Sequence, residues 1–145
     1  MPELKPILLV EDNPKDVELT LAALEDARVA NEVVVARDGA EALDYLFGRG
    51  SHEGKNTRDP ALVILDLKMP KIDGMEVLKA VKENPTLAQV PVVMLTGSKE
   101  ERDVLQGYNL GANSYVIKPF GTEEFMSAIR HLGIFWAILN EPPPA

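Results

Sequence analysis

The stretch ALVILDLKMPKIDG, residues 61–74, joins an apolar run to a polar, proline-containing segment. It opens with an apolar run without alternation, and this run is followed directly by Asp66. A short run of this kind is typical of a strand in a parallel sheet that is buried on both faces. A carboxylate at the end of such a strand needs partners, because burying an unpaired charge is costly. Asp66 therefore indicates a functional site, although in isolation it could also be a turn-forming residue.

Strand and helix patterns alternate along the rest of the chain. We expect strands at 7–10, 31–36, 61–66, 90–96 and 113–118, and helices at 13–27, 38–50, 74–84, 99–111 and 121–140. Parallel neighbours need helical crossovers, so this order predicts an α/β fold with five strands and five helices. The expected form is the flavodoxin-like, doubly wound parallel sheet with strand order 2-1-3-4-5.

Length and composition fit one globular domain. The 145 residues are 46% hydrophobic and 26% charged, which is ordinary for a soluble domain. We expect a single domain over 1–145 with a core at about 5–139, a polar insert at 49–60 and a frayed tail at 140–145. From this length we expect no output domain.

Charge and cysteine content exclude several functional classes. Fifteen basic and twenty-three acidic residues give a net charge of −8, which argues against non-specific binding to nucleic acid or to anionic membranes. The absence of cysteine excludes disulfides and thiolate sites. The N-terminal apolar run is too short for a signal sequence or a membrane span, so we expect a cytoplasmic protein.

Polar side chains close three of the predicted central strands. Glu11 and Asp12 follow the first strand, Asp66 closes the third, and Thr96 closes the fourth. Lys118 ends the fifth strand. Because the carboxyl ends of parallel strands meet at one edge, with strand three between strands one and four, these side chains converge on one crevice.

The chemistry of this set favours phosphoryl transfer. Three crowded carboxylates repel one another, and Mg²⁺ relieves that repulsion because it prefers carboxylate and phosphate oxygens. Asp66 can then act as a nucleophile toward phosphorus and form an aspartyl phosphate. The metal and Lys118 neutralise charge on the transferred group, and the Thr96 hydroxyl donates to a phosphoryl oxygen.

Four motifs carry a resemblance to a known family. They are VEDN at 10–13, LDLKMPKIDG at 65–74, MLTG at 94–97 and KPF at 118–120. Each is weak alone, but all four occur in order at strand ends. Over nearly its full length the chain resembles the receiver domain of two-component response regulators.

The resemblance implies a role for each matching residue. Asp66 is the phosphoacceptor, Asp12 a direct Mg²⁺ ligand and Glu11 a ligand through water. The remaining roles implied by the resemblance are the metal-binding backbone carbonyl of Lys68, the phosphate-binding pair Thr96 and Lys118, and the switch aromatic Tyr115. Lys68 departs from the usual pattern, and we predict that its cation shields the acyl phosphate from hydrolysis.

The resemblance also implies partners. A stand-alone receiver accepts its phosphoryl group from a sensor histidine kinase, changes the surface of helix four, strand five and helix five, and signals through a partner or a downstream phosphotransfer protein. The polar insert at 49–60 and the apolar end GIFWAILNEPPP at 133–144 resemble single-domain regulators that partner bacterial phytochrome kinases.

Two other functions stay open at this point. One is a receiver-like binding module that is never phosphorylated, although the intact set of site residues argues against it. Taken alone, Glu11 and Asp12 could also be polar residues that leave a buried strand and cap the next helix from Asn13. The other is a phosphatase of the haloacid dehalogenase type, although that family has a second aspartate where Lys68 stands. His52 and His131 have no ligand spacing, which argues against a zinc site.

The last predicted helix carries more apolar residues than one core face needs. Five of them form one stripe toward the sheet: Phe125, Ile129, Leu132, Trp136 and Leu139. Four apolar residues lie off this stripe: Met126, Ile134, Phe135 and Ile138. They could cover neighbouring loops, but we interpret them as a self-association surface and expect a homodimer.

Overall fold

The computed structural model describes residues 5–50, 59–67, 74–108, 111–112, 114–118 and 121–132. Five parallel strands form one sheet of order β2-β1-β3-β4-β5. The strands are β1 (Ile7–Val10), β2 (Val33–Ala36), β3 (Leu62–Asp66), β4 (Val92–Thr96) and β5 (Ser114–Ile117). The helices are α1 (Pro14–Asp26), α2 (Gly39–Phe47), α3 (Gly74–Glu83), α4 (Lys99–Tyr108) and α5 (Thr122–Leu132). The predicted flavodoxin-like α/β fold is confirmed.

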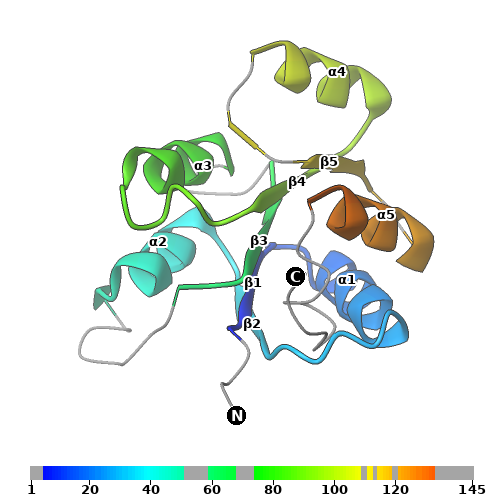
Figure 1. Cartoon of the computed structure of the whole chain (residues 1–145), viewed down its shortest axis with the longest axis horizontal. Helices are drawn as coiled ribbons and strands as arrows, with labels where there is room; N and C mark the ends of the chain where they lie inside the picture. Colours follow the sequence, from blue (N-terminus) through cyan, green and yellow to red (C-terminus); the bar gives the residue numbers. More distant parts are fainter. Residues whose placement is uncertain are drawn as a thin grey trace, which may run out of the picture.

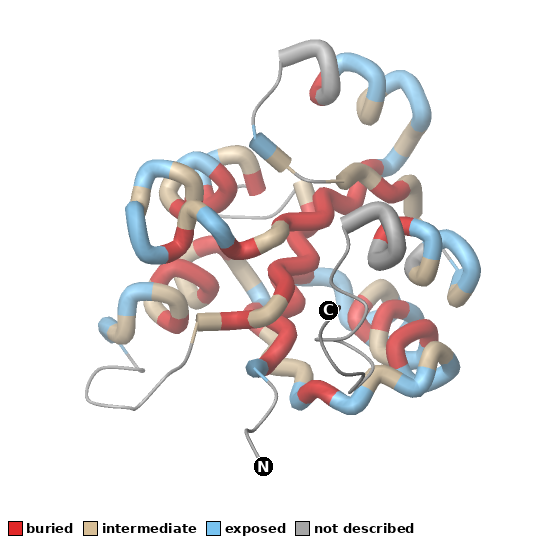
Figure 2. The backbone as a smooth tube through the Cα atoms, viewed as in Figure 1, coloured by how far each residue is buried: buried red, intermediate tan, exposed pale blue. Residues whose placement is uncertain are grey.

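The sheet is the middle of three layers (Figure 1). Leu8 and Val10 of β1 face a core cluster formed with α2 and α3, whereas Ile7 and Leu9 face a second cluster formed with α1 and α5. Because successive side chains of a strand point to opposite faces, a central strand covered on both sides must be apolar throughout. Figure 2 shows the buried residues gathered along the central strands.

Local signals set the ends of two helices. The side chain of Asn13 accepts hydrogen bonds from the backbone N–H groups of Lys15 and Asp16, and Pro14 occupies the first turn of α1. An N-cap of this kind satisfies amides that have no partner within the helix. Helix α2 ends at Gly48, which has a φ of 62°, a conformation that glycine adopts without steric cost.

Four strands begin later than the sequence predicts, and β3 does so by one residue, at Leu62 rather than at residue 61. β2 begins at Val33 rather than at residue 31, because buried Asn31 instead uses its amide to bond the Lys5 carbonyl at 2.7 Å. β4 begins after Pro91, and the preceding Val90 N–H donates to the Leu87 carbonyl in a turn. β5 begins at Ser114 rather than at residue 113, which lies outside the described residues.

Helix α5 differs from its prediction at one residue. The sequence places Met126 off the stripe that faces the sheet, but in the structure Met126 is half-buried and packs against the cluster shared with α1. The part of the predicted helix beyond residue 132, with Ile134, Phe135 and Ile138, lies outside the described residues. Among the helices that the structure describes, none has the length and apolar character to cross a membrane.

Candidate functional site

The register of the sheet brings the predicted site residues to one edge. Val10 of β1 pairs with Leu65 of β3, so Glu11 and Asp66, the next residues, lie side by side. On the far side of β4, the Lys118 N–H donates to the Thr96 carbonyl at 2.7 Å, which fixes the end of β5. The carboxyl edge of the sheet therefore carries the two carboxylates and the lysine, as predicted from the strand ends.

Lys118 is the centre of the site. Its Nζ donates to Glu11 Oε1 and to Asp16 Oδ2, both at 2.8 Å, and lies 3.2 Å from Asp66 Oδ1. Glu11 has no exposed surface and Asp66 is 5% exposed. Hydrogen bonds between ionised partners are the strong ones in proteins, so this arrangement orients all three carboxylates.

Burial and neighbouring charges shift the pKa values of Glu11 and Lys118. The pKa of Glu11 rises from 4.5 to about 7, chiefly because burial penalises its charge; Asp66 raises it further, while Lys118 and the Asn13 N–H oppose the shift. Burial alone would lower the pKa of Lys118, but hydrogen bonds to Asp16 and Glu11 and the charge of Asp66 raise it above its usual range. The carboxylate charge is thus only partly neutralised by Lys118.

The same edge can hold a divalent cation. One carboxylate oxygen each from Glu11, Asp12 and Asp66 lie within 4.8 Å of one another. Asp12 is exposed and the other two are buried, so a cation would be reached from the solvent side. Oxygen-only ligands at this spacing suit a hard divalent ion such as Mg²⁺, which also keeps bound water. The residues present therefore fit a divalent metal.

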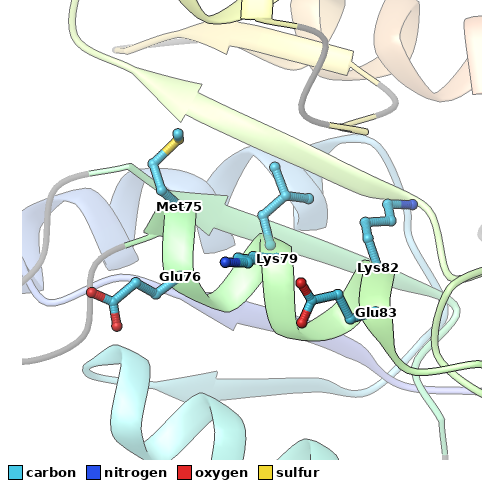
Figure 3. Close-up of a pocket in the computed structure, with 6 residues that line it drawn as sticks. Met75, Glu76, Lys79, Lys82 and Glu83 are labelled. Atoms are coloured by element: carbon cyan, nitrogen blue, oxygen red, sulfur yellow. The ribbon is translucent and has the colours of Figure 1, made fainter.

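A pocket of about 240 Å³ opens over these groups, and we name it the carboxylate pocket. The residues that line it are Glu11, Asp12, Asn13, Asp16, Asp66, Leu67, Gly97, Glu101 and Lys118. A larger hollow of about 420 Å³ lies on α3, lined by Met75, Glu76, Leu78, Lys79, Lys82 and Glu83 (Figure 3). The second hollow shares no lining residue with the carboxylate pocket and holds no candidate site residue.

Gly74 allows the chain to close against the phosphoacceptor candidate. Its N–H donates to the Leu67 carbonyl at 2.9 Å, so the first residue of α3 lies directly against the end of β3. A Cβ atom at Gly74 would clash with the carbonyl oxygen of Asp66. Glycine is needed here because the two backbones approach so closely.

Two predicted switch residues lie away from the carboxylate pocket. The Thr96 hydroxyl is buried and donates weakly to the carbonyls of Ser98 and Val116, at 3.4 and 3.5 Å. Thr96 is not among the lining residues that the structure describes. Tyr115 is half-buried against the cluster under α2 and α3, and burial raises the pKa of its hydroxyl. Lys68 lies outside the described residues.

Sequence reasoning missed two residues of the site. Asp16 comes from the first turn of α1, and Glu101 comes from α4, where its carboxylate accepts from the Gly97 N–H at 2.8 Å. Both are acidic residues in the first turn of a helix that directly follows a site strand. That position was the available signal, because such turns lie at the carboxyl edge of the sheet.

Comparisons with known proteins agree with this geometry. The sequence profile named "response regulator receiver domain" matches residues 7–130. The response regulator Rcp1 of Synechocystis is 39% identical over 132 residues, which cover 91% of this chain and 88% of Rcp1. The structure of the bacteriophytochrome response regulator AtBRR has a TM-score of 0.89 at 60% identity and covers 97% of this chain and all of the other.

Two further solved structures bear on the chemistry. The Mn²⁺-bound form of Rcp1 has a TM-score of 0.74 at 38% identity, covering 97% of this chain and 99% of the other. The phosphorylated cyanobacterial phytochrome response regulator RcpA has the same TM-score and identity, covering 98% of this chain and 99% of its own.

Proposed function

This chain belongs to the response regulator receiver family, and on that premise we propose that Asp66 accepts a phosphoryl group from a sensor histidine kinase. The observation that carries the proposal is the buried Asp66 carboxylate, 3.2 Å from the Lys118 ammonium and grouped with Glu11 and Asp12. A structural carboxylate would need only the lysine, whereas this set also provides a cation site beside the nucleophile. Magnesium is the divalent ion that we propose for it.

The proposed reaction moves one phosphoryl group. A carboxylate oxygen of Asp66 attacks the phosphorus of a phosphohistidine, the new P–O bond forms, and the P–N bond breaks as the imidazole leaves. Bound Mg²⁺ supplies positive charge for the phosphoryl oxygens. Lys118 donates a hydrogen bond to one of these oxygens. The burial of Asp66 keeps away water that would compete with it as the nucleophile. Phosphoryl transfer depends mainly on such positioning and charge neutralisation.

We propose that Thr96 and Tyr115 then report the phosphoryl group to the surface of α4, β5 and α5. The Thr96 hydroxyl gives up only long hydrogen bonds, at 3.4 and 3.5 Å, when it turns toward the phosphate. Bonds of that length are weak, so the cost of the movement is small. Moving the equilibrium from nearly off to nearly on requires about 5.5 kcal/mol of preference for the active state. Two or three charge-assisted bonds to a phosphoryl group can supply it.

The relatives suggest the partners. Because AtBRR and RcpA are named as phytochrome response regulators, we propose a bacteriophytochrome histidine kinase as the phosphoryl donor, in the cytoplasm. The output passes to a partner or a downstream phosphotransfer protein. We also propose a homodimer through the apolar residues Ile134, Phe135 and Ile138, without Met126, which packs against the core cluster shared with α1. Sedimentation equilibrium with and without beryllofluoride tests it, since a monomer in both conditions would contradict it.

Intact mass measurement tests the phosphoacceptor. Incubation with acetyl phosphate and Mg²⁺ should add one phosphoryl group to the wild-type protein, and hydroxylamine should remove it because it cleaves acyl phosphates. Asp66→Asn should show no adduct, whereas Asp103→Asn, at an exposed aspartate of α4, should behave like the wild type. An adduct that persists in Asp66→Asn would contradict the assignment. A wild-type protein that takes no phosphoryl group would instead indicate a binding module.

A further inference from the structure

Helix α1 holds the lysine of the site through Asp16. The Asp16 Oδ2 atom lies 2.8 Å from Lys118 Nζ, as close as Glu11 Oε1. The pair is partly shielded, with 29% of the Asp16 side chain and 20% of the Lys118 side chain exposed. Asp16 is therefore a fourth carboxylate of the carboxylate pocket, and it comes from a helix rather than from a strand end.

The position of Asp16 is fixed by the start of α1. The Asn13 side chain caps the helix and accepts from the Asp16 N–H at 3.3 Å, which sets the first turn. A carboxylate in the first turn is favoured by the positive end of the helix dipole. Helix α1 covers the same face of the sheet as α5 (Figure 1). Asp16 therefore has a fixed position at the carboxyl edge of the sheet and contacts Lys118 from the solvent side.

Asp16 competes with a phosphoryl group for Lys118. An ammonium has three N–H donors, and the three carboxylates of Glu11, Asp16 and Asp66 lie within reach of all of them. An arriving phosphoryl oxygen must take over one of these donors. Glu11 and Asp66 would also be bound by the metal, which would replace part of their interaction with Lys118. Asp16 has no such second partner, so its bond is the one that keeps Lys118 away from the phosphoryl group.

Asp16 also repels the group that is transferred. Since Nζ lies 2.8 Å from Asp16 Oδ2 and 3.2 Å from Asp66 Oδ1, these oxygens are at most about 6 Å apart. A negative phosphoryl group on Asp66 would stand at a similar distance from the Asp16 carboxylate. The competition for Lys118 and the repulsion of the phosphoryl group both disfavour the phosphorylated state.

Resting on the function proposed above, we propose that Asp16 is a positioning residue: it restrains Lys118 in the resting arrangement and weakens binding of a phosphoryl group at Asp66. Its removal should favour the phosphorylated state without any loss of the catalytic groups themselves.

The test compares the full chain with Asp16→Asn, Asp16→Ala and Glu18→Gln. Glu18 lies on the same helix and is exposed, so Glu18→Gln makes the same charge change away from the pocket. Beryllofluoride binding is titrated by ¹⁹F NMR at saturating Mg²⁺, and Mg²⁺ binding alone is titrated separately. Loss of a unit charge at about 6 Å in a partly exposed site should lower the apparent Kd for beryllofluoride about threefold to tenfold in both Asp16 variants.

The affinity for beryllofluoride should rise in the Asp16 variants, whereas the affinity for Mg²⁺ alone should not. Mg²⁺ alone should bind Asp16→Asn equally or more weakly, since the pocket has lost a carboxylate, and a merely loosened structure would weaken both ligands. The proposal is overturned if beryllofluoride binds the Asp16 variants no more tightly than the wild type, or if Glu18→Gln gains as much. Failure of every protein, the wild type included, to bind beryllofluoride would instead remove the proposed function and this inference with it.

Discussion

Replacing Glu11 with glutamine should stabilise the metal-free protein at neutral and alkaline pH. Glu11 is fully buried beside Asp66, and this environment raises its pKa from 4.5 to about 7. Glutamine has nearly the same shape and can still accept a hydrogen bond from Lys118, but it carries no charge. Glu11→Gln therefore removes the cost of ionising a carboxyl group in a crowded, buried position.

The sign and size follow from linkage between folding and proton binding. Between pH 4.5 and about 7 the folded protein binds more protons at Glu11 than the unfolded chain does, so the contribution of Glu11 to stability falls as pH rises through this window. Each pKa unit corresponds to about 1.4 kcal/mol. Between pH 4 and pH 8 the free energy of unfolding of the wild type should therefore fall by about 3 kcal/mol relative to that of Glu11→Gln.

Urea unfolding at pH 4, 6 and 8, without metal and with Mg²⁺, measures this difference. The difference between the two free energies of unfolding cancels the contributions of the other titrating groups. Glu18→Gln, on the exposed side of α1, controls for the change in net charge. Mg²⁺ at a hundred times its Kd should offset most of this difference at pH 8, because it stabilises by about 2.7 kcal/mol only the protein that binds it. If the difference in the free energy of unfolding between wild type and Glu11→Gln does not change with pH, then Glu11 does not have a raised pKa in the folded protein.

Substitutions at three further positions test the surroundings of the site. Gly74→Ala should cost about 1–3 kcal/mol in urea unfolding, because its Cβ would clash with the Asp66 carbonyl oxygen; wild-type stability would contradict that close approach. Asn13→Ala should cost about 1 kcal/mol in the same assay through loss of the α1 cap, whereas Asn13→Asp should retain most of it. Lys68→Ala should speed loss of the acyl phosphate, followed by intact mass over time, and an unchanged rate would show that the lysine does not shield it.

Sequence reasoning found the strand-end residues because parallel order determines where strand ends go. Glu11, Asp66 and Lys118 each follow a short apolar run, and any sheet of order 2-1-3-4-5 must bring them to one edge. The strand starts were less well predicted. Asn31 and Val90 stand at the predicted strand starts, but Asn31 takes part in a side-chain contact and Val90 in a turn, which depend on tertiary neighbours rather than on pattern.

Asp16 and Thr96 show what cannot be predicted from the positions of the strand ends alone. Asp16 reaches Lys118 only because α1 packs at a particular rotation over the sheet, and its apolar spacing fixes that rotation only coarsely. Thr96 closes β4 as predicted, yet its hydroxyl donates to the carbonyls of Ser98 and Val116 rather than into the carboxylate pocket. A side-chain rotamer depends on the local bonds available to it, which a sequence pattern does not report.

Direct mapping of the phosphorylated residue tests whether Asp66 is the phosphoacceptor. The full chain is incubated with Mg²⁺ and acetyl phosphate, reduced with borohydride, which converts an aspartyl phosphate to homoserine, and digested for peptide mass spectrometry. We predict homoserine at position 66 alone, and only when Mg²⁺ and the phosphoryl donor are both present. Homoserine at Asp12 or at another aspartate, with Asp66 unmodified, would contradict the account.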